Sequence, residues 1–188
     1  MNLDNWYKEY YLNHYKYKNK KRDDLLMNKE VIFQFLARKK CFINSLTEIP
    51  IDKKNCKIAD IGCGSCTDLM NLVSLGFNQN NLYGIDINKN DIDFGMRNFP
   101  LLNLTNQDAR NLNFEDNFFD LVYESTMFVQ LNNEKVSQMI SNEMLRITKK
   151  NGFLIIFDWR YGKINDKNFL ACSKKRVKKC LKSEYHQP

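Results

Sequence analysis

Short apolar runs and stretches of helical periodicity alternate along the middle of the chain. Strands are predicted over residues 56–61, 82–87, 102–106, 119–123 and 153–157, and helices over residues 67–75, 90–98 and 133–148. Strands separated by helices predict a parallel sheet with helices on both faces. Five strands joined by right-handed crossovers give an α/β fold, a doubly wound and mostly parallel Rossmann-like sheet.

The two ends of the chain have a different pattern. Between residues 31 and 46 apolar side chains recur at helical spacing, which predicts an amphipathic helix whose apolar face lies in the core. Asp23 and Asp24 near its start complement the helix dipole, and Pro50 leads into the sheet. We therefore divide the chain into an N-terminal helical cap (1–55), a ligand-binding core (56–160) and a basic C-terminal segment (161–188).

A glycine-punctuated turn joins the first predicted strand to its helix. Gly62 and Gly64 let the backbone turn sharply and approach a ligand, and the N–H groups of the helix start face the same space. Asp86 ends the second predicted strand, 22 residues past Gly64. A carboxylate at this place in a βαβ unit can accept hydrogen bonds from both hydroxyls of a ribose. The pattern predicts an adenosine-containing cofactor.

Over residues 56–158 this order of features resembles the class I S-adenosylmethionine-dependent methyltransferases. Asp60, Gly62 and Gly64 match their acid-x-Gly-x-Gly-x-Gly motif, and Cys66 replaces the third glycine. A side chain there occupies space in which glycine lets helix and strand pack closest, so we expect an effect on cofactor affinity. The resemblance implies S-adenosylmethionine as cofactor, bound by Asp60, Gly62, Cys63, Gly64, Cys66, Asp86, Ile87, Asp108, Ala109 and Glu124.

The resemblance also suggests how these contacts divide. Asp108 and Ala109, after the third strand, correspond to the residues that hold the adenine amino group, although a surface turn would also explain the acid. Ile87 is expected to pack on the adenine face. Glu124, at the end of the fourth strand, is expected to contact the cofactor and is a weak catalytic candidate as a base toward an acceptor hydroxyl. An exposed loop glutamate without a catalytic role is the alternative.

Asp158, Trp159 and Arg160 follow the fifth strand at the same sheet edge and are the predicted acceptor-binding residues. The whole arrangement resembles the small-molecule methyltransferases of quinone, sterol and polysaccharide pathways, which implies methyl transfer to a small-molecule or glycan acceptor on oxygen. Residues 123–128 contain neither the Pro-Pro-aromatic nor the Pro-Cys run of base methyltransferases. The family normally adds two further strands. The 31 residues after Phe157 are too few for both with their helix, so these strands are expected to be missing.

Other readings of the glycine loop are weaker. A nicotinamide-binding fingerprint would need glycine at Thr67. Cys63 and Cys66 form a C-x-x-C pair that competes as a redox or metal motif, but no second cysteine pair completes a four-ligand site. We expect six free thiols and no metal.

Charge is unevenly distributed in this chain of 188 residues with net charge +7. Residues 1–57 carry a net charge of +6, residues 58–147 of −7, and residues 148–188 of +8. Basic ends could attract an anionic acceptor, so an RNA-directed methyltransferase stays open as an alternative. The expected absence of the last strands keeps a second alternative open, a cofactor-binding protein without turnover. No run approaches the ~20 apolar residues of a membrane span, and a cytoplasmic protein is expected.

Aromatic residues near the N-terminus add one more hypothesis. Trp6, Tyr7, Tyr11 and His14 are spaced to share one helical face that could cover the cofactor and screen the methyl group from water. Ordinary packing is the alternative for this face. Surface roles are expected for His14 and His186, the two histidines of the chain, because neither has triad or metal spacing.

Overall fold

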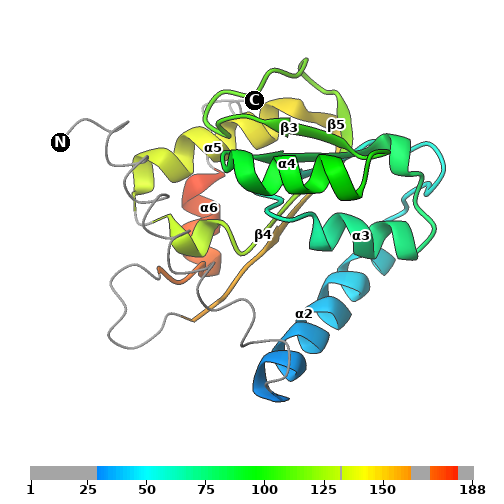
Figure 1. The fold of residues 1–188 in the computed structure, drawn as a ribbon. Helices are drawn as coiled ribbons and strands as arrows, with labels where there is room; N and C mark the ends of the chain where they lie inside the picture. Colours follow the sequence, from blue (N-terminus) through cyan, green and yellow to red (C-terminus); the bar gives the residue numbers. More distant parts are fainter. Residues whose placement is uncertain (1–28, 132, 162–169, 182–188) are drawn as a thin grey trace. The chain divides into compact units, whose positions relative to one another are not determined.

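Parallel strands alternate with helices through most of the chain, as the sequence pattern predicts (Figure 1). The computed structural model describes residues 29–131, 133–161 and 170–181. Its strands are β1 (Ile58–Ile61), β2 (Leu82–Asp86), β3 (Asn103–Asn106), β4 (Phe119–Ser125) and β5 (Thr148–Phe157). Its α-helices are α2 (Lys29–Thr47), α3 (Thr67–Ser74), α4 (Lys89–Asn98), α5 (Glu134–Ile147) and α6 (Lys174–Cys180), and its short 3₁₀ helices are η1 (Gln79–Asn81) and η2 (Phe128–Gln130).

The five strands form one sheet in the order β3-β2-β1-β4-β5, and every pairing is parallel. The doubly wound α/β prediction is confirmed. In the register, Ile61 of β1 lies beside Glu124 of β4, and Glu124 lies beside Ile156 of β5. The carboxyl ends of the central strands therefore meet at one edge of the sheet, where open α/β folds bind their ligands.

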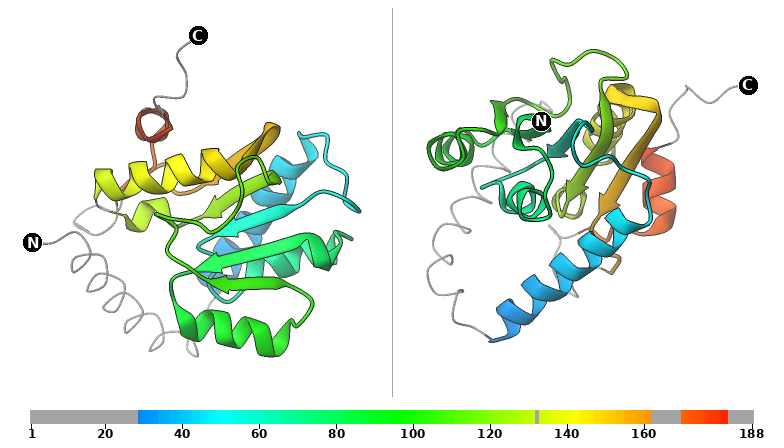
Figure 2. Two further views of the ribbon diagram at one scale, coloured as in Figure 1. Left: turned by 90° about the horizontal axis from the view of Figure 1, so that it is seen from above. Right: turned by 90° about the vertical axis from the view of Figure 1, so that its right-hand side faces the viewer.

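Helices cover both faces of the sheet. The chain moves from β1 outward to β3 through α3 and α4, and from β4 to β5 through α5, so right-handed crossovers place α3 and α4 on one face and α5 on the other (Figure 2). The last helix, α6, packs against α5. With both faces covered, β1 is buried along its whole length, which explains its nearly unbroken apolar sequence.

An aromatic cluster closes the end of the sheet opposite the glycine loop. Tyr83, Phe114, Phe118 and Phe119 contact one another with ring centroids 4.8 to 6.1 Å apart, mostly edge to face. The ammonium of Lys57 lies 3.9 Å from the Phe118 ring centroid. Such contacts stabilise beyond their buried area, and this end of the sheet is therefore structural.

The chain divides into two compact units, residues 1–47 and 48–188. In the first, the predicted helix is present as α2, but its apolar face is only partly buried. Phe42 and Leu46 are buried, whereas Ile32, Phe33, Phe35 and Leu36 are 42 to 72% exposed. The prediction of a core face is therefore wrong for this half of α2, since periodicity alone does not say what covers a face. Asp23 and Asp24 lie outside the described residues.

Strand β5 begins five residues earlier than predicted, at Thr148 rather than at residue 153. Thr148 pairs with Phe119 and Phe153 with Leu121, so the polar residues between them form an irregularity inside the strand. A Cβ on Gly152 would lie 2.9 Å from the Asp120 carbonyl oxygen, so only glycine fits there. Within residues 158–161 and 170–181 no strand follows β5. None of the described helices is long and apolar enough to span a membrane.

Candidate functional site

The glycine loop after β1 is held open by three residues with left-handed backbone conformation. Gly62, Gly64 and Cys66 have φ of 79°, 51° and 65°. The Gly62 and Cys63 N–H groups donate to the Ile85 carbonyl at 2.7 and 3.1 Å, which fixes the loop on β2. A Cβ on Gly64 would meet nothing within 4 Å. Open space therefore lies beside Gly64, where the loop is expected to receive a ligand.

Asp86 ties this loop to the tip of β2. Its carboxylate is almost fully buried and accepts hydrogen bonds from the Gly64 N–H and the Asn88 N–H, both at 2.8 Å. Each carboxylate oxygen has a second lone pair. Asp86 therefore holds the loop against the tip of β2, and its role toward a ribose stays a prediction.

Cys66, which replaces the third glycine of the motif, is accommodated by a glycine elsewhere. Its sulfur is fully buried, and a Cβ on Gly95 of α4 would lie 2.8 Å from it. Gly84 of β2 makes room for the Cys63 sulfur in the same way, because a Cβ there would lie 2.9 Å from that sulfur. The loop keeps its glycine-like turn, and the extra volume is absorbed by α4 rather than by the open side of the loop.

The two loop thiols interact with each other. A side-chain hydrogen bond between them lowers the pKa of Cys66 and, together with burial, raises the pKa of Cys63. All six cysteines are free thiols. Within the described part of the chain, no three His, Cys, Asp or Glu side chains come together as metal ligands would.

The predicted adenine-binding residues follow β3. The Asp108 carboxylate accepts from its neighbour Arg110, from the backbone N–H at 2.9 Å and from the guanidinium at 2.6 to 3.1 Å. Ala109 is buried, and Ile87 is half-buried at the tip of β2. The structure thus brings Asp86, Ile87 and Asp108 to the same sheet edge. In this structure the Asp108 side chain is paired with Arg110.

Glu124 is completely buried at the end of β4, so the expectation of an exposed loop glutamate is wrong. Its Oε2 accepts from the Met127 and Phe128 N–H groups at 2.8 and 3.3 Å, and its Oε1 has no hydrogen-bond partner among the described residues. Burial, followed by the nearby Asp158 and Asp60 carboxyl groups, raises the pKa of Glu124 well above its ordinary value. Burial therefore favours the neutral form of this side chain.

Met127 links Glu124 to the glycine loop. A Cβ on Gly62 would lie 3.1 Å from the Met127 sulfur, so the two are in close contact. By receiving the N–H groups of residues 127 and 128, Glu124 orders the turn that presses Met127 against the loop. Tyr123, the residue before Glu124, is also fully buried, and burial and the neighbouring Asp60 carboxylate raise the pKa of its hydroxyl.

Asp158 lies directly after β5 and receives the next N–H of the same turn. Its Oδ2 accepts from the Val129 N–H at 2.6 Å and its Oδ1 from the Trp159 N–H at 2.7 Å. Burial, then Asp158 and then Glu124, raise the pKa of the nearby Cys172 to about 12. Three consecutive backbone N–H groups thus fix two carboxyl groups side by side at the carboxyl ends of β4 and β5.

Beyond Asp158 the surface is hollowed between β5 and α6. The hollow has a volume of about 340 Å³, and its lining includes Ile156, Asp158, Arg160, Lys174, Val177 and Lys178. We call it the β5–α6 hollow. Two of the three predicted acceptor residues, Asp158 and Arg160, line it, and Trp159 beside them is 49% exposed. The part contributed by α6 was not predicted, because a basic run gives no signal of what it packs against.

Two sequence hypotheses lie outside the described residues. They are the aromatic lid of Trp6, Tyr7, Tyr11 and His14, and the surface role of His186.

Comparison with known proteins decides the family. A family model described as a methyltransferase domain matches residues 58–152, half of the chain and all five strands except the end of β5. The chain belongs to the methyltransferase domain family. S-adenosylmethionine is the cofactor of this methyltransferase domain. No curated protein sequence matches the chain.

Solved structures agree with the family. A protein from Pyrococcus horikoshii OT3 is similar with a TM-score of 0.64 and 20% identity over 79% of this chain and 80% of that one. A SAM-dependent methyltransferase from Aquifex aeolicus is similar with a TM-score of 0.57 and 18% identity, over 73% of this chain and 75% of that one. A SAM-dependent methyltransferase from Methanosarcina mazei is similar with a TM-score of 0.50 and 26% identity, over 56% of this chain and 53% of that one. The chain therefore spans about half the length of that protein. The first two likenesses show the shared fold.

The loop of this methyltransferase domain fits its cofactor. The open space beside Gly64 and the Asp86 carboxylate at the next strand tip provide an approach for the backbone and acceptors for a ribose. Three aspartates lie at this edge, Asp60, Asp86 and Asp108, which suits a cofactor carrying a sulfonium cation.

Proposed function

We propose that the protein transfers a methyl group from S-adenosylmethionine to a hydroxyl of a small-molecule or glycan acceptor bound in the β5–α6 hollow. The observation that carries this proposal is the place of Asp158. On one side its carboxylate lines the hollow, and on the other side it neighbours Glu124. Glu124 in turn holds the backbone of Met127, which contacts the glycine loop. An acceptor in the hollow therefore lies at the same sheet edge as the cofactor loop, with a carboxylate in reach.

In this proposal the cofactor is held by the loop and by three strand ends. Gly62, Cys63, Gly64 and Cys66 supply the close backbone approach, with Asp60 at the end of β1 beneath them. Asp86 accepts from the ribose, and Ile87, Asp108 and Ala109 surround the adenine. The bound cofactor supplies an electrophilic methyl group, so transfer needs alignment and exclusion of water more than strong acid or base catalysis.

The two neighbouring carboxyl groups take different roles. Glu124, which is buried, acts as a positioning residue that orders residues 127 and 128 against the loop. Asp158, at the wall of the hollow, is placed to accept the proton of the acceptor hydroxyl as the methyl group is transferred. Trp159 and Arg160 contact the rest of the acceptor. A hydroxyl is favoured as the acceptor group because a carboxyl group at the wall of the hollow suits removal of a hydroxyl proton.

Calorimetric titration with S-adenosylmethionine tests the cofactor assignment. We expect saturable binding, weakened at least tenfold in Asp86→Ala, because ribose acceptors are lost. Asp86→Asn keeps one oxygen that can accept from the Gly64 N–H but lacks the second acceptor oxygen and the charge. This variant therefore separates the support of the loop from the binding of the ribose. Asp93→Ala, which removes an exposed acid paired with Lys89 on α4, is the matched control and should bind like the wild type. Equal binding by all variants would contradict the role of Asp86.

Methyl transfer from labelled cofactor to panels of hydroxyl, amine and RNA acceptors tests the rest. We expect label on hydroxyl compounds, lost in Asp158→Asn at unchanged cofactor affinity. Label found in RNA would instead support the RNA-directed alternative. Cofactor binding without transfer to any panel member would support a binding protein without turnover.

A further inference from the structure

We infer that the acceptor carries a phosphate group, and that Arg160, Lys174 and Lys178 bind it at the mouth of the β5–α6 hollow. The inference rests on the proposed function and adds the chemical class of the acceptor. Its basis is the charge of the hollow: three cationic side chains and one carboxylate, Asp158, line it. The carboxylate already accepts two backbone hydrogen bonds. Within the described residues, none of the three cations has a carboxylate partner.

Two of the other basic residues of α6, Arg176 and Lys179, have structural partners. Arg176 donates to the Leu131 carbonyl at 2.6 Å, to the Leu170 carbonyl at 2.8 Å and to the Ser137 hydroxyl at 3.2 Å. Lys179 pairs with Glu134 of α5. These contacts use the face of α6 that packs on α5. Lys174 and Lys178, one helical turn apart, lie on the face that borders the hollow, so the division of charges follows the helix period.

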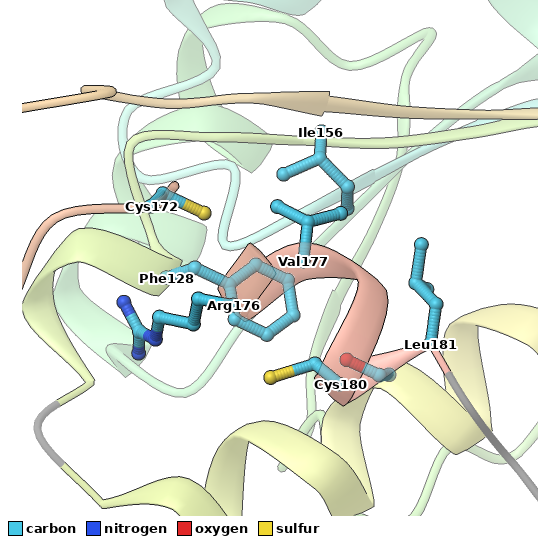
Figure 3. A pocket seen from close by; sticks show the side chains of 8 residues that line it. Phe128, Ile156, Cys172, Arg176, Val177, Cys180 and Leu181 are labelled. Atoms are coloured by element: carbon cyan, nitrogen blue, oxygen red, sulfur yellow. The ribbon is translucent and has the colours of Figure 1, made fainter. Parts of the chain in front are cut away.

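The helix that presents these lysines is firmly anchored. The Leu170 N–H donates to the Val129 carbonyl at 2.9 Å and the Cys172 N–H to the Trp159 carbonyl at 2.8 Å, so the chain leading into α6 is tied to the site. Figure 3 shows Ile156 of β5 and Val177 of α6 close together between these two elements, with Phe128 beside them. Because the backbone of α6 is already held in place, its ordering costs no further entropy when an anion binds to its lysines.

The cations of the hollow repel one another, and a phosphate would remove this repulsion. Like charges at i and i+4 destabilise a helix, and Arg160 adds a third positive charge at the same opening. A phosphate with two negative charges and several acceptor oxygens neutralises such a cluster and makes charge-assisted hydrogen bonds. A volume of about 340 Å³ suits a small ligand such as a sugar phosphate. An extended nucleic-acid backbone would need a longer basic track.

Fluorescence of Trp159 measures this binding directly. The chain has two tryptophans, so Trp6→Phe leaves Trp159, next to Arg160, as the sole reporter. With pyrophosphate as the probe at constant ionic strength, we expect a saturable change. In the double variant Lys174→Gln/Lys178→Gln the dissociation constant should rise at least tenfold, since each lost charge-assisted contact weakens binding by about tenfold. Lys54→Gln/Lys150→Gln, equal in charge and located at exposed positions away from the hollow, should bind like the parent.

Further titrations identify the source of the anion. If glucose 6-phosphate binds and glucuronate binds only weakly, the result supports a phosphorylated acceptor. Stronger binding of glucuronate, or of a single-stranded RNA that displaces pyrophosphate, would overturn it. Equal loss of binding in both double variants would show a nonspecific charge effect and also overturn it. Titration with S-adenosylmethionine on the same samples separates the two proposals: cofactor binding without pyrophosphate binding rejects the phosphate site alone, whereas absent cofactor binding rejects the proposed function.

Discussion

Glu124 is a residue whose ionisation opposes folding. Its pKa is raised in the folded protein, so below the ordinary pKa of glutamate both the folded and the unfolded chain hold the proton. As pH rises above that value, the unfolded chain releases its proton while the folded protein retains it, and stability falls until the pKa of the folded state is reached. Each unit by which the pKa is raised costs about 1.4 kcal/mol of unfolding free energy at high pH.

Glu124→Gln should remove this pH dependence. The amide oxygen can still accept from the Met127 and Phe128 N–H groups, and the amide N–H₂ can donate to the neighbouring Asp158. Urea unfolding should give equal stability for both proteins near pH 4 and a more stable variant near pH 8. Glu115→Gln, at an exposed position, is the control and should have no effect at either pH. A difference that is the same at every pH would rule out the assigned ionisation.

Gly84 sets the space behind the cofactor loop. A Cβ there would lie 2.7 Å from a Leu104 methyl, 2.8 Å from a Leu69 methyl and 2.9 Å from the Cys63 sulfur. Because three neighbours would have to move at once, Gly84→Ala should lower the free energy of unfolding by about 2 kcal/mol, within the usual range for overpacking. Gly95→Ala meets two close neighbours and gains helix propensity of up to about 1 kcal/mol, so it should cost less. Denaturant midpoints of the two variants check this order.

At the scale of elements, Arg146 of α5 holds the segment between β3 and β4. Its guanidinium donates to the Leu112 and Phe114 carbonyls at 2.8 and 2.7 Å and pairs with Asp116 and Glu143. Arg146→Met should lower the free energy of unfolding by about 2 kcal/mol, since charge-assisted hydrogen bonds are lost. It should also speed cleavage at Glu115 by a glutamate-specific protease. Arg97→Met, exposed at the end of α4, is the control. Unchanged cleavage would show that the segment does not depend on Arg146.

The elements that periodicity predicts best are the buried ones. Leu82–Asp86 and Thr67–Ser74 appear within a residue of their predicted bounds because a glycine or an acid ends each apolar run. The apolar pattern predicts the start of β5 five residues too late, since the polar side chains of Lys149, Lys150 and Asn151 interrupt it although they lie within the strand. The partners of α6 could not be predicted either, because the contacts of Arg176 join residues up to 45 positions apart.

Within the site, sequence reasoning located residues but not their neighbours. The motif order placed Asp60, Gly64 and Asp86 at one sheet edge, and the parallel register brings them there. The motif does not show that Gly95, on the next helix, makes room for Cys66. Nor does it show that Glu124 is buried beside Asp158, because that depends on pairing between β4 and β5.

At the scale of the whole molecule, charge is separated in a way that matches two different ligands. The central residues 58–147, which form the cofactor loop and its acidic surroundings, carry a net charge of −7, whereas residues 148–188 carry +8. In the proposed function the acidic part faces a cofactor with a sulfonium cation, and the basic part provides the lysines of the β5–α6 hollow. Opposite fields on neighbouring regions favour binding of each ligand at its own place.

Cofactor binding should therefore stabilise the whole fold, because the loop that receives it joins β1, β2 and α3. A ligand at 100 times its dissociation constant adds about 2.7 kcal/mol to the free energy of unfolding. For a chain of this length each kcal/mol raises the melting temperature by about 2–4 °C, so S-adenosylmethionine should raise it by roughly 5–10 °C. Asp86→Ala should remove the rise, and Asp93→Ala should keep it. A rise of equal size in Asp86→Ala would place the stabilising contact away from the ribose acceptor at the tip of β2.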